Sequence, residues 1–148
     1  MKTRIVSSIV ASVAMTLALA ACNRAESPGK VSSDVAEAQA DKQDKVADAR
    51  ADQAETQRDT ASEAVSHDPD DRGDAIQKRA GAAYDTAIAA AEGDRKVAKQ
   101  ACEALQGDSQ AACKKSADAS YDAAKANAQM ARDAEKQRGD AVQKLDNK

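Results

Sequence analysis

Two cysteines late in the chain, Cys102 and Cys113, are the residues whose type and spacing most directly suggest chemistry. They lie symmetrically about Gly107-Asp108, because their numbers sum to 215, twice 107.5. Two helices folded back at that point would bring the thiols opposite each other, and an oxidising compartment would join them. Closing a loop of this size stabilises the folded chain by about 3 kcal/mol in the chain-entropy model. We therefore predict a structural disulfide.

Metal or redox chemistry at the same pair is less favoured by the sequence. A zinc site needs two further Cys or His ligands, and the only histidine, His67, is distant in the sequence. A redox pair typically has C-x-x-C spacing, whereas ten residues separate these two cysteines. Unpaired or intermolecular thiols are the remaining alternative.

The search for other reactive groups favours a protein with no catalytic activity and no cofactor. No nucleophile motif, phosphate loop or zincin signature is found in the chain. His67 is followed by three acids that could weakly hold a cation: Asp68, Asp70 and Asp71. A helix beginning at Pro69 with Asp68 as its N-cap explains these acids without a ligand, so no metal site is predicted.

The composition predicts an all-α fold that is elongated and thin. The sequence has no Phe or Trp, two Tyr and few large aliphatic side chains. Alanine dominates instead, along with aspartate, lysine, glutamine and arginine, and all of these except aspartate favour helices. Because ordering each residue costs on the order of 1.5 kcal/mol, so few large apolar side chains cannot support a thick core.

Gly and Pro positions predict where the helices begin and end. We expect a linker over 22–32, a first helix over 33–66 and a helical hairpin over 69–148 with its turn at 106–109. Gly107 suits a left-handed helix end, and Asp108 or Ser109 could cap the helix that follows. Three helices of roughly 50 to 57 Å would result, as an antiparallel hairpin or as an elongated three-helix bundle or coiled coil.

Small residues recur in register along the two arms of this hairpin. The sum of 215 pairs Ala98 with Ala117 and Tyr84 with Ala131, and it places Tyr121 in the seam between the helices. A repeat at an offset of 37 relates Tyr84 to Tyr121 and Arg95 to Arg132, and a second echo relates 72–78 to 138–144. On the second helix, the predicted packing stripe consists of Ile76, Ala80, Ala83, Ala87, Ala91, Ala98, Ala101 and Leu105.

The N-terminus has the layout of an export signal. Lys2 and Arg4 precede an uncharged stretch from Ile5 to Leu19, which is too short for a stable membrane span. The following residues, Leu19-Ala20-Ala21-Cys22, resemble the lipobox of bacterial lipoproteins. That resemblance implies a signal peptide over 1–21, cleavage between Ala21 and Cys22, and lipid on the Cys22 thiol. Ordinary secretion, with cleavage after the A-x-A sequence Ala18-Leu19-Ala20, is the alternative.

The resemblance also carries an expectation about location. Asn23 stands where an Asp would resemble the signal for retention in the inner membrane. We therefore expect the chain on the periplasmic face of the outer membrane of a Gram-negative bacterium. Without residues 1–21 the formal charge is −5, from 20 basic and 25 acidic side chains, so nucleic acid is not an expected partner.

Two functions are consistent with these features. The first is a structural or interaction lipoprotein of the cell envelope, because residues 84–125 resemble Ala-rich helix pairs of Gram-negative proteins with a C-x10-C staple. The second is a peptidoglycan tether similar to the murein lipoprotein, whose C-terminal lysine is joined to the cell wall; here that residue would be Lys148. Expected partners are the membrane through the lipid, and a periplasmic protein or peptidoglycan. A second copy of the chain could cover the thin alanine stripe of the first helix.

Overall fold

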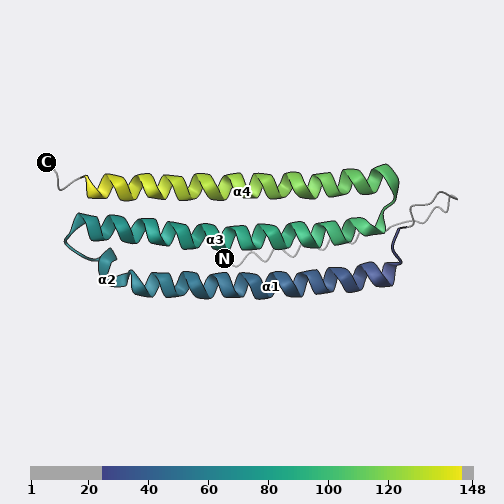
Figure 1. Ribbon diagram of the computed structural model, residues 1–148, viewed down its shortest axis with the longest axis horizontal. Helices are drawn as coiled ribbons and strands as arrows, with labels where there is room; N and C mark the ends of the chain where they lie inside the picture. The colour runs from purple at the N-terminus through teal and green to yellow at the C-terminus, as the bar shows by residue number, and fades with distance from the viewer. Residues whose placement is uncertain (1–24, 145–148) are drawn as a thin grey trace, which may run out of the picture.

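The computed structural model describes residues 25–144, which are almost entirely helical (Figure 1). The elements are α1 (Pro28–Asp59), α2 (Ala61–Ala64), α3 (Pro69–Ala101), the 3-10 turn η1 (Cys102–Ala104) and α4 (Gly107–Gln143). No strand occurs within this part of the chain. The predicted all-α fold with long helices and an antiparallel hairpin is confirmed.

Side-chain caps with a following proline start α1 and α3. Ser27 is the N-cap of α1 and accepts a hydrogen bond from the Lys30 backbone N–H, with Pro28 at the first helical position. The predicted linker through residue 32 was therefore too long, because proline fits this position and its missing N–H is not needed there. Asp68 caps α3 as predicted, and its carboxylate accepts a hydrogen bond from the Asp70 backbone N–H at 2.9 Å.

The first helix also ends earlier than the sequence predicts. It stops at Asp59, and Thr60 starts a reversal that contains the four-residue helix α2. Thr60 is 2% exposed, and its hydroxyl donates to the Thr56 carbonyl while it accepts a hydrogen bond from Arg79 of α3. Val65, directly after α2, is 79% exposed. A polar contact with another helix therefore sets this boundary.

The turn between α3 and α4 is close to the predicted one. Gly107 has φ of 55°, the left-handed conformation that glycine adopts at low cost. The predicted cap by Asp108 or Ser109 was wrong, because Gln106 is the N-cap and its side chain makes no capping hydrogen bond. Asp108 lies in the first turn of α4, where its charge interacts favourably with the positive end of the helix.

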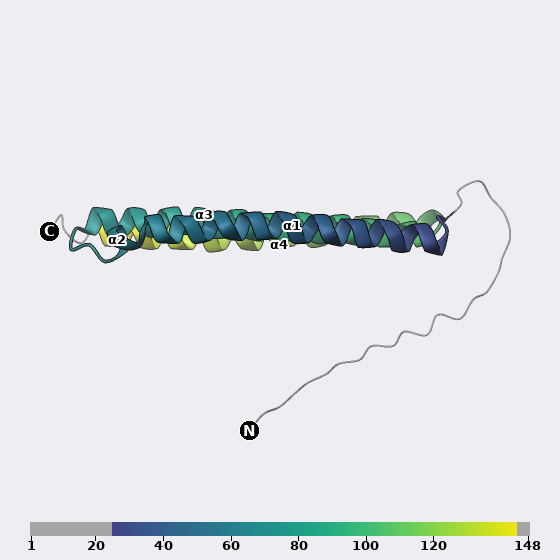
Figure 2. The same ribbon diagram turned by 90° about the horizontal axis from the view of Figure 1, so that it is seen from below.

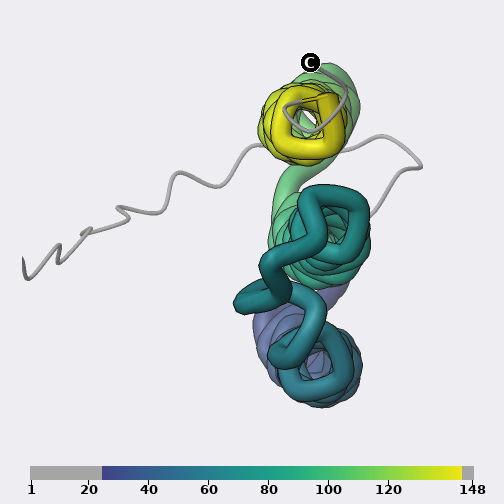
Figure 3. Tube along the Cα trace, turned by 90° about the vertical axis from the view of Figure 1, so that its left-hand side faces the viewer, coloured from purple at the N-terminus to yellow at the C-terminus, as the bar shows by residue number. Residues whose placement is uncertain are grey.

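The three long helices lie side by side in one flat layer, with α3 in the middle (Figure 1). The end view shows them in a row, and the view from below shows a layer one helix thick (Figures 2 and 3). Helix α3 packs on α1 along one side and on α4 along the other, whereas α1 and α4 make no contact with each other. The arrangement is therefore an open layer rather than a bundle closed around a shared core.

The apolar core of this layer is correspondingly thin. Its buried apolar residues are Val31, Ala38, Val46, Ala75, Ala80, Ala91, Cys102 and Ala117. They form two narrow seams, one on each side of α3, and most of them are alanines. Small side chains allow helices to approach closely, but each one removes little apolar surface from water.

Candidate functional site

The disulfide between Cys102 and Cys113 closes one end of the layer, as the spacing predicts. The Cα atoms of the two residues are 5.7 Å apart, a normal separation for a disulfide. Cys102 is 1% exposed, and Cys113 is half-buried in the first turns of α4. The bond joins Cys102, which directly follows α3, to Cys113 of α4. It therefore fixes the register of the α3–α4 hairpin.

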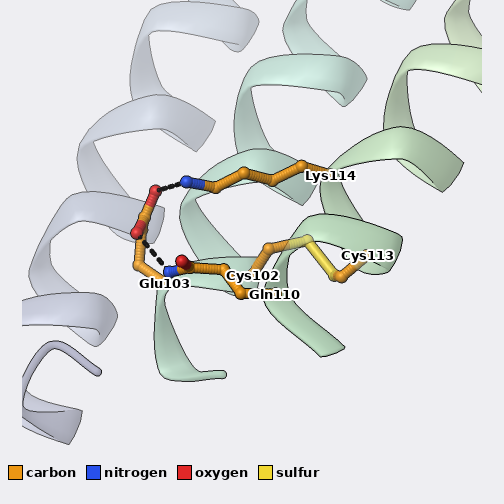
Figure 4. The surroundings of a disulfide bond; sticks show 5 residues. All are labelled: Cys102, Glu103, Gln110, Cys113 and Lys114. Atoms are coloured by element: carbon orange, nitrogen blue, oxygen red, sulfur yellow. Dashed lines mark hydrogen bonds and ion pairs between the residues drawn. A yellow bond between two sulfur atoms is a disulfide. The ribbon is translucent and has the colours of Figure 1, made fainter. Parts of the chain in front are cut away.

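Glu103 connects this stapled end to α4 and to the start of the described chain. Its carboxylate pairs with the Lys114 ammonium at 2.6 Å and accepts a hydrogen bond from the Gln110 amide at 2.8 Å (Figure 4). Its backbone carbonyl accepts a hydrogen bond from the Glu26 N–H at 3.0 Å. Glu103 thus contacts both α4 and the segment just before α1 at this end of the layer.

Along the α3–α4 seam, the repeated residues form two matching pairs. Arg132 lies over the Tyr84 ring at 4.6 Å, and Arg95 lies over the Tyr121 ring at 5.1 Å, as in cation–π contacts. Both tyrosines are half-buried in the seam, as predicted. The repeat at an offset of 37 therefore places equivalent residues so that each Tyr meets the Arg of the other helix.

The second echo, between 72–78 and 138–144, makes another reciprocal pair near the far end. The Gln77 amide donates to Asp140 at 2.8 Å, and the Gln143 amide donates to Asp74 at 2.9 Å. Two buried glycines, Gly73 and Gly139, make room for this contact. A Cβ on Gly139 would lie 2.9 Å from the Gly73 carbonyl oxygen, so the helices are in close contact here.

The α1–α3 seam has a set of polar contacts beside its buried valines and alanines. The Thr86 hydroxyl lies 3.1 Å from the Ala49 carbonyl and 3.1 Å from the Gln53 side-chain oxygen. Arg79 donates to the Thr60 hydroxyl at 2.7 Å and to the Thr60 carbonyl at 3.2 Å. Ion pairs Lys96–Asp41 and Lys42–Asp94 also join these helices. Sequence reasoning missed this set, since neither the spacing nor the apolar pattern identifies polar partners on distant helices.

One broad face of the layer is charged. On α4 it is formed by Lys114, Asp118, Asp122, Lys125, Gln129, Arg132, Lys136, Asp140 and Gln143, which follow the helical repeat. Asp118 pairs with Lys99 at 2.7 Å and with Arg95. Hydrogen bonds from Lys99 and then Arg95 hold the pKa of Asp118 below its ordinary value, and Lys96 does the same for Asp41. These acids and bases neutralise one another at an exposed surface.

The opposite side of α4 carries no charge over most of its length. It consists of Ser109, Ala112, Ser116, Ser120, Ala123, Asn127, Ala131 and Ala134, spaced three or four residues apart and all exposed. The matching side of α3 consists of Ile76, Ala83, Ala87, Ala90, Val97 and Ala101, and Leu105 follows in the turn. We call these residues together the uncharged face. Asp94, paired with Lys42, is the charged residue that interrupts its α3 part.

A groove runs along the uncharged face between α3 and α4. It has a volume of about 680 Å³, and Val97, Ala98, Ser116, Ala117 and Ser120 are among its lining residues. The sequence placed all of the α3 stripe in the packing seam, but Leu105 is 41% exposed and Ala83 and Ala101 are also exposed. Helix α4 therefore covers only part of the apolar side of α3, and the rest of that side is exposed.

The structure does not assemble a site around His67. This residue is exposed and lies between α2 and α3, where Ser66 donates a hydrogen bond to Asp71 at 2.8 Å and Asp68 caps the helix. Within residues 25–144, no group of three His, Cys, Asp or Glu side chains is arranged to hold a metal ion.

Several predicted sites lie outside the described residues. They are the lipobox residues Leu19 to Cys22, with Ala21 and Cys22 at the cleavage point, and the C-terminal Lys148. Among the helices that the structure does describe, none is both long and apolar enough to cross a bilayer.

Comparison with known proteins returned no relative. Searches of protein-family models, curated proteins and solved structures found no match to this chain.

Proposed function

We propose that this chain is a lipid-anchored structural or interaction lipoprotein of the cell envelope, with no catalytic role, that holds a rigid three-helix rod at the periplasmic face of the outer membrane. The anchor rests on the lipobox resemblance at Leu19 to Cys22, and the rod is the flat layer of α1, α3 and α4. The described helices offer charged and uncharged surfaces rather than an enclosed reaction site. Their partners would be a periplasmic protein or peptidoglycan.

The end of the layer at which α1 begins supports this proposal most directly. Helix α1 begins at the same end of the layer as the Cys102–Cys113 turn (Figure 1). Cys22 is three residues before Ala25, so at most about 10 Å of extended chain would separate the lipid from the described rod. The stapled end would therefore face the membrane, and the rest of the rod, about 50 Å long, would extend from it.

The second candidate is a covalent peptidoglycan tether through Lys148. It is favoured by the path of α4, which starts at the stapled end and finishes at the opposite end of the layer (Figure 1). Lys148 follows Gln143 by five residues. A lipid at one end of the rod and a C-terminal lysine beyond the other is the order that a link between membrane and cell wall requires.

Intact mass of the full chain, purified from expressing cells with and without reductant and after lysozyme digestion, tests both candidates. We expect a chain that starts at acylated Cys22, weighs two hydrogens less before reduction and carries no muropeptide. A muropeptide that disappears in a Lys148→Ala variant would favour the tether. An unmodified chain that starts at Ala21 would overturn the anchor, and a Cys22→Ser variant is the control for lipid attachment.

A further inference from the structure

We propose that the uncharged face is the contact surface for a second copy of this chain, so that two three-helix layers stack face to face as a dimer. The surface is distinct from the alanine stripe of α1. The proposal does not depend on the lipid anchor, because it rests only on described residues of α3 and α4.

The distribution of charge separates this face from the rest of the rod. Charged residues make up 32% of the chain, yet none of the eight uncharged-face positions of α4 from Ser109 to Ala134 is charged. The other side of the same helix carries both acids and bases. Depletion of charge in the centre of a surface patch is typical of protein interfaces.

The area of the face is sufficient for a stable dimer. The α3 part from Ile76 to Ala101 and the α4 part from Ser109 to Ala134 are each about 39 Å long at 1.5 Å per residue, and two helices spaced 8 to 10 Å apart give a width of about 18 Å. Each copy would then bury on the order of 700 Å². Specific protein interfaces bury about 600 to 1,000 Å² per partner.

The shape of the face favours an identical layer over other occupants. Its side chains are mostly Ala and Ser, so the surface is flat, and a second flat surface can approach it closely along the whole length. The groove of about 680 Å³ between α3 and α4 is open on this side. Ile76 and Leu105, the larger apolar side chains of the face outside the groove lining, are those that a second layer would present to it. A two-fold axis makes such a contact self-complementary.

A bilayer is a less suitable occupant. Helices that lie on membranes present bulky apolar side chains such as Trp, Phe and Leu together with basic residues. The chain has no Trp or Phe, and the residues of the uncharged face on α4 are Ala and Ser with one asparagine, Asn127. Stacking also supplies the second layer that a helical domain normally needs to enclose a core.

Sedimentation equilibrium of the full chain in a density-matched non-ionic detergent tests the proposal. We expect the mass of two chains for the wild type and a dissociation constant at least about tenfold higher for Asn127→Glu, which places a charge near the centre of the face. Gln129→Glu on the charged face is the matched control, because it also replaces an amide with a carboxylate, and it should dimerise as the wild type does.

A second control places a charge on the outer edge of α4. Ala126 is exposed and lies nine residues, or 2.5 helical turns, after Ala117, which is buried against α3. It therefore points away from α3, and Ala126→Glu should leave the dimer as stable as that of the wild type. Circular dichroism checks that all variants remain helical.

Three results would overturn the proposal. One is a wild-type chain that remains monomeric at about 100 μM. This outcome includes a monomer that uses the uncharged face to bind lipid vesicles or another protein. Another is a dimer that Asn127→Glu leaves intact. The third is a dimer that either control variant weakens as much as Asn127→Glu does, because the contact would then lie elsewhere.

Discussion

Helix α3 is shared by two seams that are built in different ways. Against α4 it presents small residues in register, two matching Tyr–Arg pairs and a disulfide at one end. Against α1 it presents long polar side chains, including Arg79 and Lys96, that reach hydroxyl, carbonyl and carboxylate oxygens. The α3–α4 seam has a covalent bond in addition to its hydrogen bonds and ion pairs, whereas the α1–α3 seam has noncovalent contacts alone.

This difference indicates where each seam is vulnerable. The α3–α4 seam depends on the geometry of a short turn and on a bond that reductant can break. The α1–α3 seam has no covalent link between its helices in the described chain, and its only buried polar side chain is Thr60 at the end of α1. Changes to one seam should therefore leave the other largely intact, which the following experiments examine.

Removing the disulfide should have the largest effect. A Cys102→Ala/Cys113→Ala variant should lose about 3 kcal/mol of unfolding free energy, because the unfolded chain regains the freedom of a closed loop. Urea unfolding measures this loss, and reduction of the wild type should reproduce it. A loss below about 1 kcal/mol would mean that the α3–α4 seam is held by packing alone.

Thr60→Val should weaken the α1–α3 seam. The variant keeps the side-chain volume but removes the hydroxyl that accepts the 2.7 Å hydrogen bond from Arg79. A hydrogen bond to a charged group contributes about 1.5 to 3 kcal/mol. Arg79 retains the Gln57 and Thr60 carbonyls as acceptors, so we expect a loss of about 1.5 kcal/mol. Hydrogen exchange should become faster in α2 and the end of α1, and α4 should be unaffected.

Thr56→Val is the control for that change. Its hydroxyl donates to the Asp52 carbonyl at 3.0 Å, within α1, so the substitution removes no hydrogen bond to α3. The expected change is within about 0.5 kcal/mol. Equal losses in the two variants would contradict the role assigned to Thr60.

Gly139→Ala should test how closely α3 and α4 approach. The new Cβ would lie 2.9 Å from the Gly73 carbonyl oxygen, so backbone must shift, at a cost of about 1 to 3 kcal/mol. The higher helix propensity of alanine offsets about 1 kcal/mol of this, which leaves a net loss of about 1 kcal/mol.

Gly81→Ala in α3 supplies the matched comparison. A Cβ at Gly81 would have no atom within 4 Å, so only the gain in helix propensity remains. Thermal unfolding should show a stabilisation of about 0.5 to 1 kcal/mol. A stabilising Gly139→Ala would show that the far end of the hairpin is more open than described.

Acid should weaken both seams by a small amount. Asp118 and Asp41 have pKa values below the ordinary 3.8, held there by Lys99 with Arg95 and by Lys96. Their contribution to stability is therefore present above pH 3.8 and is lost as the pH falls through the lowered values. Asp118→Asn should reduce the loss of stability between about pH 4 and pH 2 in thermal unfolding, and an unchanged acid profile would contradict this pairing.

The sequence alone determined the local and covalent features of the chain. Helix-forming residues, the Asp68-Pro69 start and the symmetric spacing of Cys102 and Cys113 predicted helices, a break and a stapled hairpin. These features depend on neighbours in the sequence or on one short turn, so their physical causes are visible in the order of residues. The tyrosines were also placed correctly, because antiparallel register across a short turn is simple arithmetic.

The tertiary structure decided how the helices are arranged around α3. Alanine is found both in helix seams and at exposed positions, so an alanine stripe does not predict which side of a helix packs on another helix. The early end of α1 at Asp59, the polar α1–α3 seam and the exposure of the uncharged face all depend on contacts between distant residues. The open layer, with one charged face and one uncharged face, results from those contacts.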